Sequence, residues 1–229
     1  MSVKKYIYLT SFLLVLILAI FCFPSPGFAI QNQKGLLNLS VKEIVDIVVS
    51  SLGTSFALFT LWRGVEQYRK EQKWKKAEFV AKEMKEFKSD PVVKKVMLML
   101  DWNQRNIQLS DGSDNVETIF SIDSELCKAL QSKTYLNEKG GFTHCQSLIR
   151  DHFDVFFDYL ERFEVFIEVR LVTEEDFRPY LNYWLNLIGN RDSGRKSQDF
   201  YTILWEYIDF FGYEKVQKLM SRYGYCIKL

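Results

Sequence analysis

Hydrophobic residues dominate two stretches near the start of the chain and recur at helical spacing beyond them. The second stretch, residues 44–62, has nineteen residues and a single charge, Asp46. About 20 apolar residues in a helix cross a hydrocarbon core of roughly 30 Å, and no proline interrupts this run. Trp62 and Arg63 close it with the aromatic and basic residues typical of a membrane–water interface. We therefore predict a transmembrane helix over residues 41–63.

The helical pattern continues directly into a basic segment, residues 64–88. Residues 63–88 contain nine Lys or Arg and five Glu, and an excess of Lys and Arg beside a span marks its cytoplasmic side. Basic side chains near a bilayer attract anionic lipid headgroups. We expect headgroup contacts from the residues nearest the span, Arg63, Arg69, Lys70, Lys73, Lys75 and Lys76.

The far half of this segment is amphipathic. Apolar residues recur there every three or four positions, which is the spacing of one helix face. We predict that this stripe packs on the chain's own domain; its members are Trp74, Ala77, Val80, Ala81, Met84 and Phe87.

Small residues are frequent within the predicted span. Gly53 and Ala57 lie four positions apart, so they share a helix face where another helix can approach closely. The pattern predicts self-association or packing against a partner's helix.

Residues 1–29 have the layout of a signal peptide: Lys4 and Lys5, an apolar run, and small residues before a cleavage point after Ala29. An uncleaved first transmembrane helix is the alternative. Both arrangements place residues 30–40 outside the cell membrane and residues 89–229 in the cytoplasm.

The pattern after residue 89 is helical. Asp90 followed by Pro91 predicts a helix start, and further amphipathic helices are expected over residues 123–131, 143–171, 173–189, 200–211 and 213–223. Residues 103–122 are the least regular stretch. The predicted fold class is all-α: a signal or transmembrane segment, a transmembrane helix continuing into a basic stalk helix, and a cytoplasmic helical bundle.

Motifs for catalysis, cofactors or metals are absent from the sequence. His144 and His152 are the only histidines, and neither has a ligand partner at a metal spacing. Asp151, Asp154, Asp158 and Glu161 repeat along one helix face, which predicts a solvated acidic surface. The cysteines after the span show no C-x-x-C pair, and we expect them to be reduced and buried.

Charge argues against nucleic acid as a partner. Residues 89–229 hold 17 Lys or Arg and 22 Asp or Glu, a difference of −5. A net negative domain repels phosphate backbones.

Three stretches carry a family resemblance: ALFTLWRGVEQYRKEQKWKKAEFVAKEMKEF, DPVVKKVMLMLDWNQR and FFDYLERFEVFIEVRLVTEEDFRPYLNYWL. Together they resemble a group of uncharacterised bacterial proteins, chiefly cyanobacterial, with a membrane-anchored helical domain of unknown function. The resemblance covers roughly residues 57–225. It implies an all-α cytoplasmic domain behind a membrane anchor, in a plasma or thylakoid membrane, and brings no activity, cofactor or site residue with it.

Aromatic residues make up 16% of the chain, more than core packing usually requires. Exposed Tyr and Trp are enriched at protein interfaces. The leading hypothesis is a non-enzymatic, membrane-anchored module that binds a protein partner or itself. The alternatives are an accessory or regulatory subunit of a membrane transport or sensory complex, and an enzyme of unrecognised type.

Overall fold

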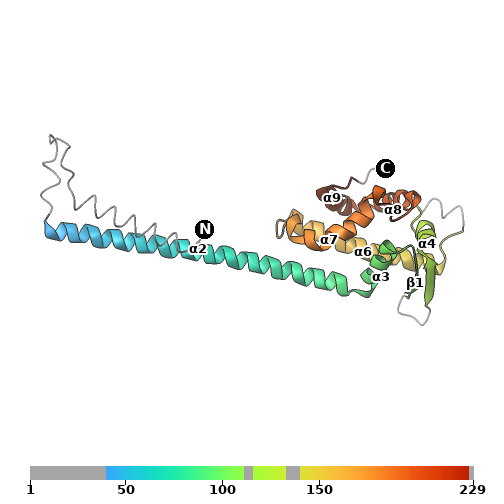
Figure 1. Ribbon diagram of the computed structural model, residues 1–229, viewed down its shortest axis with the longest axis horizontal. Coiled ribbons are helices and arrows are strands. Elements are labelled where there is room, and N and C mark those ends of the chain that lie inside the picture. Colours follow the sequence, from blue (N-terminus) through green and yellow to red (C-terminus); the bar gives the residue numbers. More distant parts are fainter. Residues whose placement is uncertain (1–39, 111–115, 133–139, 227–229) are drawn as a thin grey trace. The chain divides into compact units, whose positions relative to one another are not determined.

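The computed structural model describes residues 40–110, 116–132 and 140–226, and it divides into two compact units, residues 1–64 and 65–229. The predicted signal peptide, residues 1–29, lies outside the described residues. Within these, the structure is mostly helical, with one pair of strands (Figure 1).

The longest element is α2 (Val41–Ser89), an uninterrupted helix of 49 residues. It begins at a capping box, in which the backbone N–H of Ser40 donates to Glu43 Oε2 (2.7 Å) and that of Glu43 donates to Ser40 Oγ (3.3 Å). Its part up to Gly64, together with Ser40, forms the described portion of the first unit. Of the described helices, α2 is the one long and apolar enough to cross a membrane. The structure thus contains the apolar helix that the sequence predicts.

The second unit starts within α2, at Val65. Helix α3 (Pro91–Asp101) follows α2 directly. Asp90 Oδ1 accepts hydrogen bonds from the backbone N–H groups of Val92 (2.7 Å) and Val93 (3.2 Å). The predicted helix start at Asp90 and Pro91 is therefore confirmed.

Two strands replace the irregular stretch expected over residues 103–122. Strands β1 (Gln104–Leu109) and β2 (Glu117–Ser121) pair antiparallel, with Ile107 opposite Ile119. Ile107, Leu109 and Ile119 are buried and alternate with exposed residues, so one face of the hairpin packs on the core. The prediction of an all-α fold is wrong at this hairpin.

The remaining elements are α4 (Ile122–Ala129), α6 (His144–Glu168), α7 (Glu174–Gly189), η1 (Arg191–Ser193), α8 (Gln198–Phe210) and α9 (Glu214–Arg222). The α-helices among them confirm the helices expected in this part of the sequence, with ends shifted by at most three residues. The largest shift is at the end of α6, where Arg170 adopts a left-handed backbone conformation with φ 60° and the chain turns into α7.

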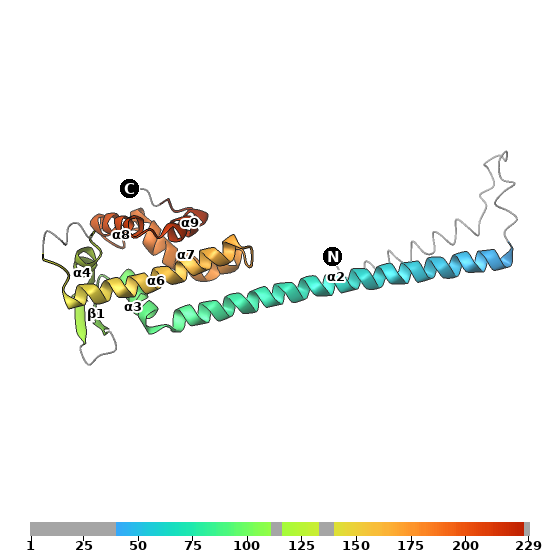
Figure 2. The ribbon, with the colours of Figure 1, turned by 180° about the vertical axis from the view of Figure 1, so that it is seen from behind.

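Helix α6 carries the central aromatic layer of the second unit. Phe87 of α2 packs against Phe156 and Phe163, with ring centroids 5.7 and 5.3 Å apart. Phe163 in turn contacts Phe177 of α7 at 4.9 Å. Helices α3, α4 and α9 also contact α6, which runs through the middle of the unit in Figure 2.

The apolar stripe predicted on α2 is only half correct. Val80, Met84 and Phe87 are buried, as expected. Ala77 and Ala81 are exposed, however, and Trp74 is 78% exposed. The buried face is rotated toward Phe79, which packs edge-on against Phe166 of α6.

Candidate functional site

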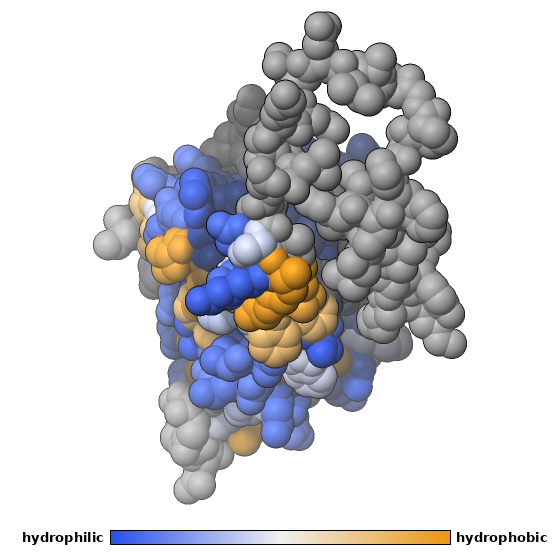
Figure 3. All heavy atoms as spheres, turned by 90° about the vertical axis from the view of Figure 1, so that its left-hand side faces the viewer, coloured by the Kyte–Doolittle hydropathy of each residue, from blue (hydrophilic) through white to orange (hydrophobic). Residues whose placement is uncertain are grey.

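The predicted helix-packing residues lie on an open face of α2. Gly53 and Ala57 are exposed, and a Cβ atom added at Gly53 would meet nothing within 4 Å. Exposed small residues continue this face at alternating spacings of three and four: Ser50, Gly53, Ala57, Thr60 and Gly64. Viewed onto the N-terminal end of α2, hydrophobic side chains gather beside hydrophilic ones (Figure 3).

The predicted headgroup-contacting residues are also on the surface of α2. Lys76 is half-buried, and the other five are exposed: Arg63, Arg69, Lys70, Lys73 and Lys75. Lys70 and Lys75 form ion pairs of 2.8 Å with Glu66 and Glu71, one turn earlier. Because such exposed pairs contribute little stability, both lysines can exchange these partners for a lipid phosphate at small cost.

A second exposed surface joins aromatic and basic side chains of the second unit. We call it the α3–α7 face; it comprises Trp102, Tyr180 and Tyr183 together with Lys88, Arg105 and Arg195. Trp102 is 47% exposed and Tyr183 is 44% exposed. Three exposed aromatic residues from two parts of the chain therefore lie beside three cations.

Asp101, the last residue of α3, connects the parts of this face. The Tyr183 hydroxyl donates a hydrogen bond to Asp101 Oδ1, and Arg195 Nη1 lies 3.3 Å from the same oxygen. The hydrogen bond to Asp101 and burial raise the pKa of Tyr183. Tyr183 is therefore neutral at physiological pH and holds α7 against α3.

Cation–π contacts place the other cations on the exposed rings. The Arg105 guanidinium lies 5.2 Å from the ring centroid of Trp102, and Lys88 Nζ lies 5.2 Å from that of Tyr180. Each ring thus presents one side to solvent with a positive charge held beside it. The surface thus combines exposed aromatic rings with positive charge.

A buried lysine supports Trp102 from below. The Lys196 side chain is wholly buried, and its Nζ donates to the backbone oxygen of Trp102 (2.7 Å) and to Asp123 Oδ1 (2.9 Å). Burial lowers the pKa of Lys196, while Asp123 acts in the opposite direction. Lys196 therefore fixes the end of α3 on which the α3–α7 face is built.

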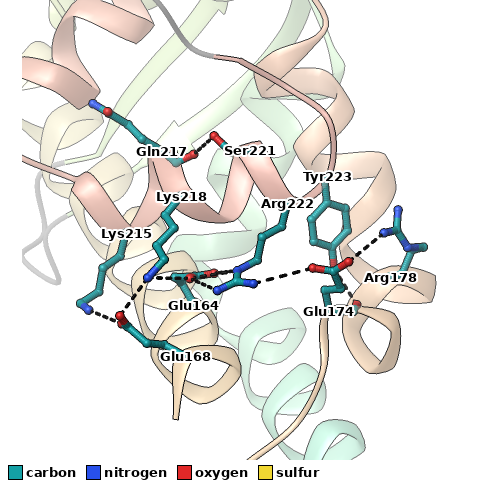
Figure 4. Close-up of polar contacts among 10 residues, drawn as sticks. All are labelled: Glu164, Glu168, Glu174, Arg178, Lys215, Gln217, Lys218, Ser221, Arg222 and Tyr223. Carbon is teal, nitrogen blue, oxygen red and sulfur yellow. Dashed lines mark hydrogen bonds and ion pairs between the residues drawn. The ribbon is translucent and has the colours of Figure 1, made fainter. Parts of the chain in front are cut away.

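Helices α6, α7 and α9 are joined by an ion-pair network (Figure 4). Glu164 of α6 is buried and accepts hydrogen bonds from Arg222 of α9. Glu168, one turn further along α6, pairs with Lys215 (2.9 Å) and Lys218 (2.8 Å). This network was not predicted from the sequence, although its residues show the spacing of a helix face: Glu164 and Glu168 on one helix, and Lys215, Lys218 and Arg222 on another.

The predicted acidic surface of α6 is wrong at Asp154. Its Oδ1 accepts hydrogen bonds from the hydroxyl groups of Tyr207 and, at 2.7 Å, Tyr213. Burial and these hydrogen bonds raise the pKa of both tyrosines. Asp151 and Asp158 are exposed, as predicted, whereas Glu161 is half-buried.

His152 is a core residue. It is buried, and its Nε2 has no hydrogen-bond partner among the described residues. Burial lowers its pKa, and the nearby charge of Lys95 acts in the same direction. Its imidazole is therefore neutral. Within the described part of the chain, no group of three His, Cys, Asp or Glu side chains is placed to hold a metal ion.

The cysteines differ in exposure. Cys127 and Cys145 are half-buried, and Cys226 is exposed. The prediction of buried cysteines is therefore wrong for Cys226.

Comparisons with protein-family models, with curated proteins and with solved structures found no match. The candidate sites therefore stand on the residues and geometry of this chain alone.

Proposed function

We propose that the chain is a membrane-anchored, non-enzymatic protein-interaction module at the cytoplasmic face of a membrane. In this proposal, residues 41–63 of α2 cross the bilayer. The basic residues after the span contact lipid headgroups, and the second unit presents its α3–α7 face to a protein partner.

The α3–α7 face is the observation that carries this proposal. Trp, Tyr and Arg are the residue types most enriched among those that dominate binding energy at protein interfaces. Here Trp102, Tyr183 and Arg105 are exposed. Asp101 holds the Tyr183 hydroxyl, and Lys196 holds the backbone oxygen of Trp102. Side chains ordered before binding lose less entropy when a partner arrives. The face is thus preorganised for contact.

The alternative is an accessory or regulatory subunit of a membrane transport or sensory complex. The small-residue face of α2 around Gly53 and Ala57 favours this alternative, because small residues let transmembrane helices pack closely. In this case the span, rather than the second unit, provides the main contact.

Site-specific photocrosslinking in native membranes tests both possibilities. Photoreactive p-benzoylphenylalanine is placed at position 102 or 183 on the α3–α7 face, at position 56 or 57 in the span, and at position 128 as a control. Lys128 is exposed on α4 and is not a member of the α3–α7 face. Adducts are identified by mass spectrometry after purification through a C-terminal tag.

A distinct protein crosslinked from positions 102 and 183, but not from position 128, supports the interaction module. Crosslinks confined to positions 56 and 57 favour the accessory subunit. Absence of any protein adduct at positions 102 and 183 contradicts the module. Protease digestion of sealed inverted vesicles checks the topology, because a cytoplasmic second unit is degraded in that preparation.

A further inference from the structure

A hollow of about 480 Å³ lies between α3 and the β-hairpin, next to the α3–α7 face. Leu98 of α3 and Ile107 of β1 form its apolar part. Lys95 approaches it from α3 and Arg105 from β1. Its volume falls within the range of small-molecule sites, about 300–1,000 Å³.

Charge distinguishes this hollow from its surroundings. Among the described residues that line it, two are cationic and none is acidic. A second hollow, of about 450 Å³, is lined by Asp123, Asp199 and Glu206. Residues 89–229 carry a net charge of −5. The described lining of this hollow, with two cations and no acid, is therefore more positive than the region as a whole.

Both cations are available to a ligand. Neither Lys95 nor Arg105 forms an ion pair with another residue in the described part of the chain. Arg105 lies against the ring of Trp102, which orients its guanidinium without neutralising it. The positive charge of Lys95 also lowers the pKa of His152 and so disfavours a third cation there.

The neutral polar residues complete a set of donors. Asn106 and Gln108 of β1 and Thr118 of β2 are the neutral polar residues of the lining, and they carry amide and hydroxyl groups that can donate hydrogen bonds. Arginine binds phosphate through parallel N–H groups, and lysine adds a compact positive charge. Two cations, polar donors and, among the described lining residues, no carboxylate make the hollow suited to a phosphate group, and Leu98 and Ile107 can contact an organic substituent.

We propose that this hollow binds the phosphate group of a small phosphorylated ligand, with Arg105 and Lys95 as its charged contacts. The phosphate comes either from a soluble phosphate ester or from a lipid headgroup. This site goes beyond the proposed protein-interaction function, and phosphate binding does not depend on a protein partner.

Calorimetric titration with inorganic pyrophosphate tests the site on the full-length protein in nanodiscs of phosphatidylcholine. Arg105→Ala and Lys95→Ala are each expected to weaken binding about tenfold, the loss of one charge-assisted hydrogen bond. Arg105→Lys keeps the charge but loses the bidentate contact, so its affinity for pyrophosphate is expected to lie between those of the wild type and Arg105→Ala. Lys94→Ala is the matched control, because Lys94 is the exposed neighbour of Lys95 on α3 and does not line the hollow.

The assignment is supported if pyrophosphate affinity changes little in Lys94→Ala and is weaker in the other variants. Absence of pyrophosphate binding to the wild-type protein overturns it, as does equal weakening in Lys94→Ala, which would indicate general charge attraction. Nanodiscs containing phosphatidylglycerol distinguish a lipid headgroup from a soluble phosphate ester as the origin of the bound phosphate. If a lipid headgroup occupies the hollow, these discs reduce pyrophosphate affinity in the wild type but not in Arg105→Ala. Unchanged affinity assigns the hollow to a soluble phosphate ester.

Discussion

Arg222 of α9 donates hydrogen bonds to both carboxylate oxygens of Glu164 of α6, with Nε 2.8 Å from Oε2 and Nη2 2.9 Å from Oε1. The Glu164 side chain is fully buried, whereas that of Arg222 is 29% exposed. A buried carboxylate is tolerated only when its charge is compensated. Arg222 therefore provides the main compensation for the buried acid, and Lys218 Nζ lies 3.8 Å from Glu164 Oε1.

Removing Arg222 is expected to destabilise the second unit strongly. Arg222→Ala leaves the Glu164 charge buried and poorly compensated, which costs about 3 kcal/mol of unfolding free energy. Urea unfolding of the full-length protein in detergent micelles, followed by circular dichroism, measures this loss. Lys128→Ala, which removes an exposed pair with Glu125, should change stability by less than about 0.5 kcal/mol. Equal effects of the two substitutions would contradict the role of Arg222.

Glu168 is expected to titrate at unusually low pH. Hydrogen bonds from Lys218 and Lys215, together with their charges, lower its pKa from 4.5 to about 2. Because the folded pKa is lower than the unfolded one, Glu168 stabilises the fold above about pH 4.5, and this contribution is lost as the pH falls toward 2. Carbon-13 NMR of the side-chain carboxyl group measures the midpoint.

The same titration in a Lys215→Ala, Lys218→Ala double variant provides the control for Glu168. Its midpoint should return toward 4.5 once both partners are removed. A midpoint near 4.5 in the wild-type protein would show that these ion pairs do not form in solution.

Gly189 is expected to resist substitution, although its backbone is helical. A Cβ atom there would overlap Met220 Cε and lie 2.6 Å from Tyr225 Cβ. Gly189→Ala must therefore displace the chain around Tyr225, at a cost of about 1–3 kcal/mol. Gly64→Ala is the comparison, since a Cβ atom at Gly64 meets nothing within 4 Å. Thermal unfolding should show a lower midpoint for Gly189→Ala and no decrease for Gly64→Ala.

Two aromatic residues of α2 are expected to behave oppositely on truncation. Phe87 is fully buried against α6, so Phe87→Ala should cost about 3–5 kcal/mol. Trp74 is mostly exposed, and Trp74→Ala should alter stability by less than about 0.5 kcal/mol. Urea unfolding of both variants measures the difference. A large loss in Trp74→Ala would mean that this face of α2 is covered, for example by a second copy.

The helices were predictable because their signals are local. Asp90 and Pro91 mark the start of α3, and Thr143 and Gln146 form the capping box that starts α6. The spacing of Phe153, Phe156 and Phe157 identifies the buried face of α6. Each signal acts within one or two helical turns, so it is visible without knowledge of the tertiary structure.

The hairpin and the α3–α7 face depend on contacts between distant residues. Ile107 lies between polar neighbours in β1, but Ile119 of β2 is followed by Phe120. The strands have only six and five residues, so the pattern is too short to establish strands by itself. Trp74 and Phe87 belong to the same apolar stripe in the sequence, yet only Phe87 is buried, because the packing partners of α2 decide which side of the helix is covered. Aromatic content predicted an exposed surface, but not that Asp101 would join Tyr183 to Arg195.

The ion pair between Glu164 and Arg222 also sets an order of events during synthesis. Arg222 lies 58 positions after Glu164, and the Tyr225 ring that covers Gly189 comes later still. Translation produces α2 long before either residue. The second unit therefore completes its fold only after α9 has been synthesised, whereas α2 is present from an earlier stage of translation. A chain that stops before α9 would keep Glu164 without its partner, which makes incomplete products unstable and open to proteolysis.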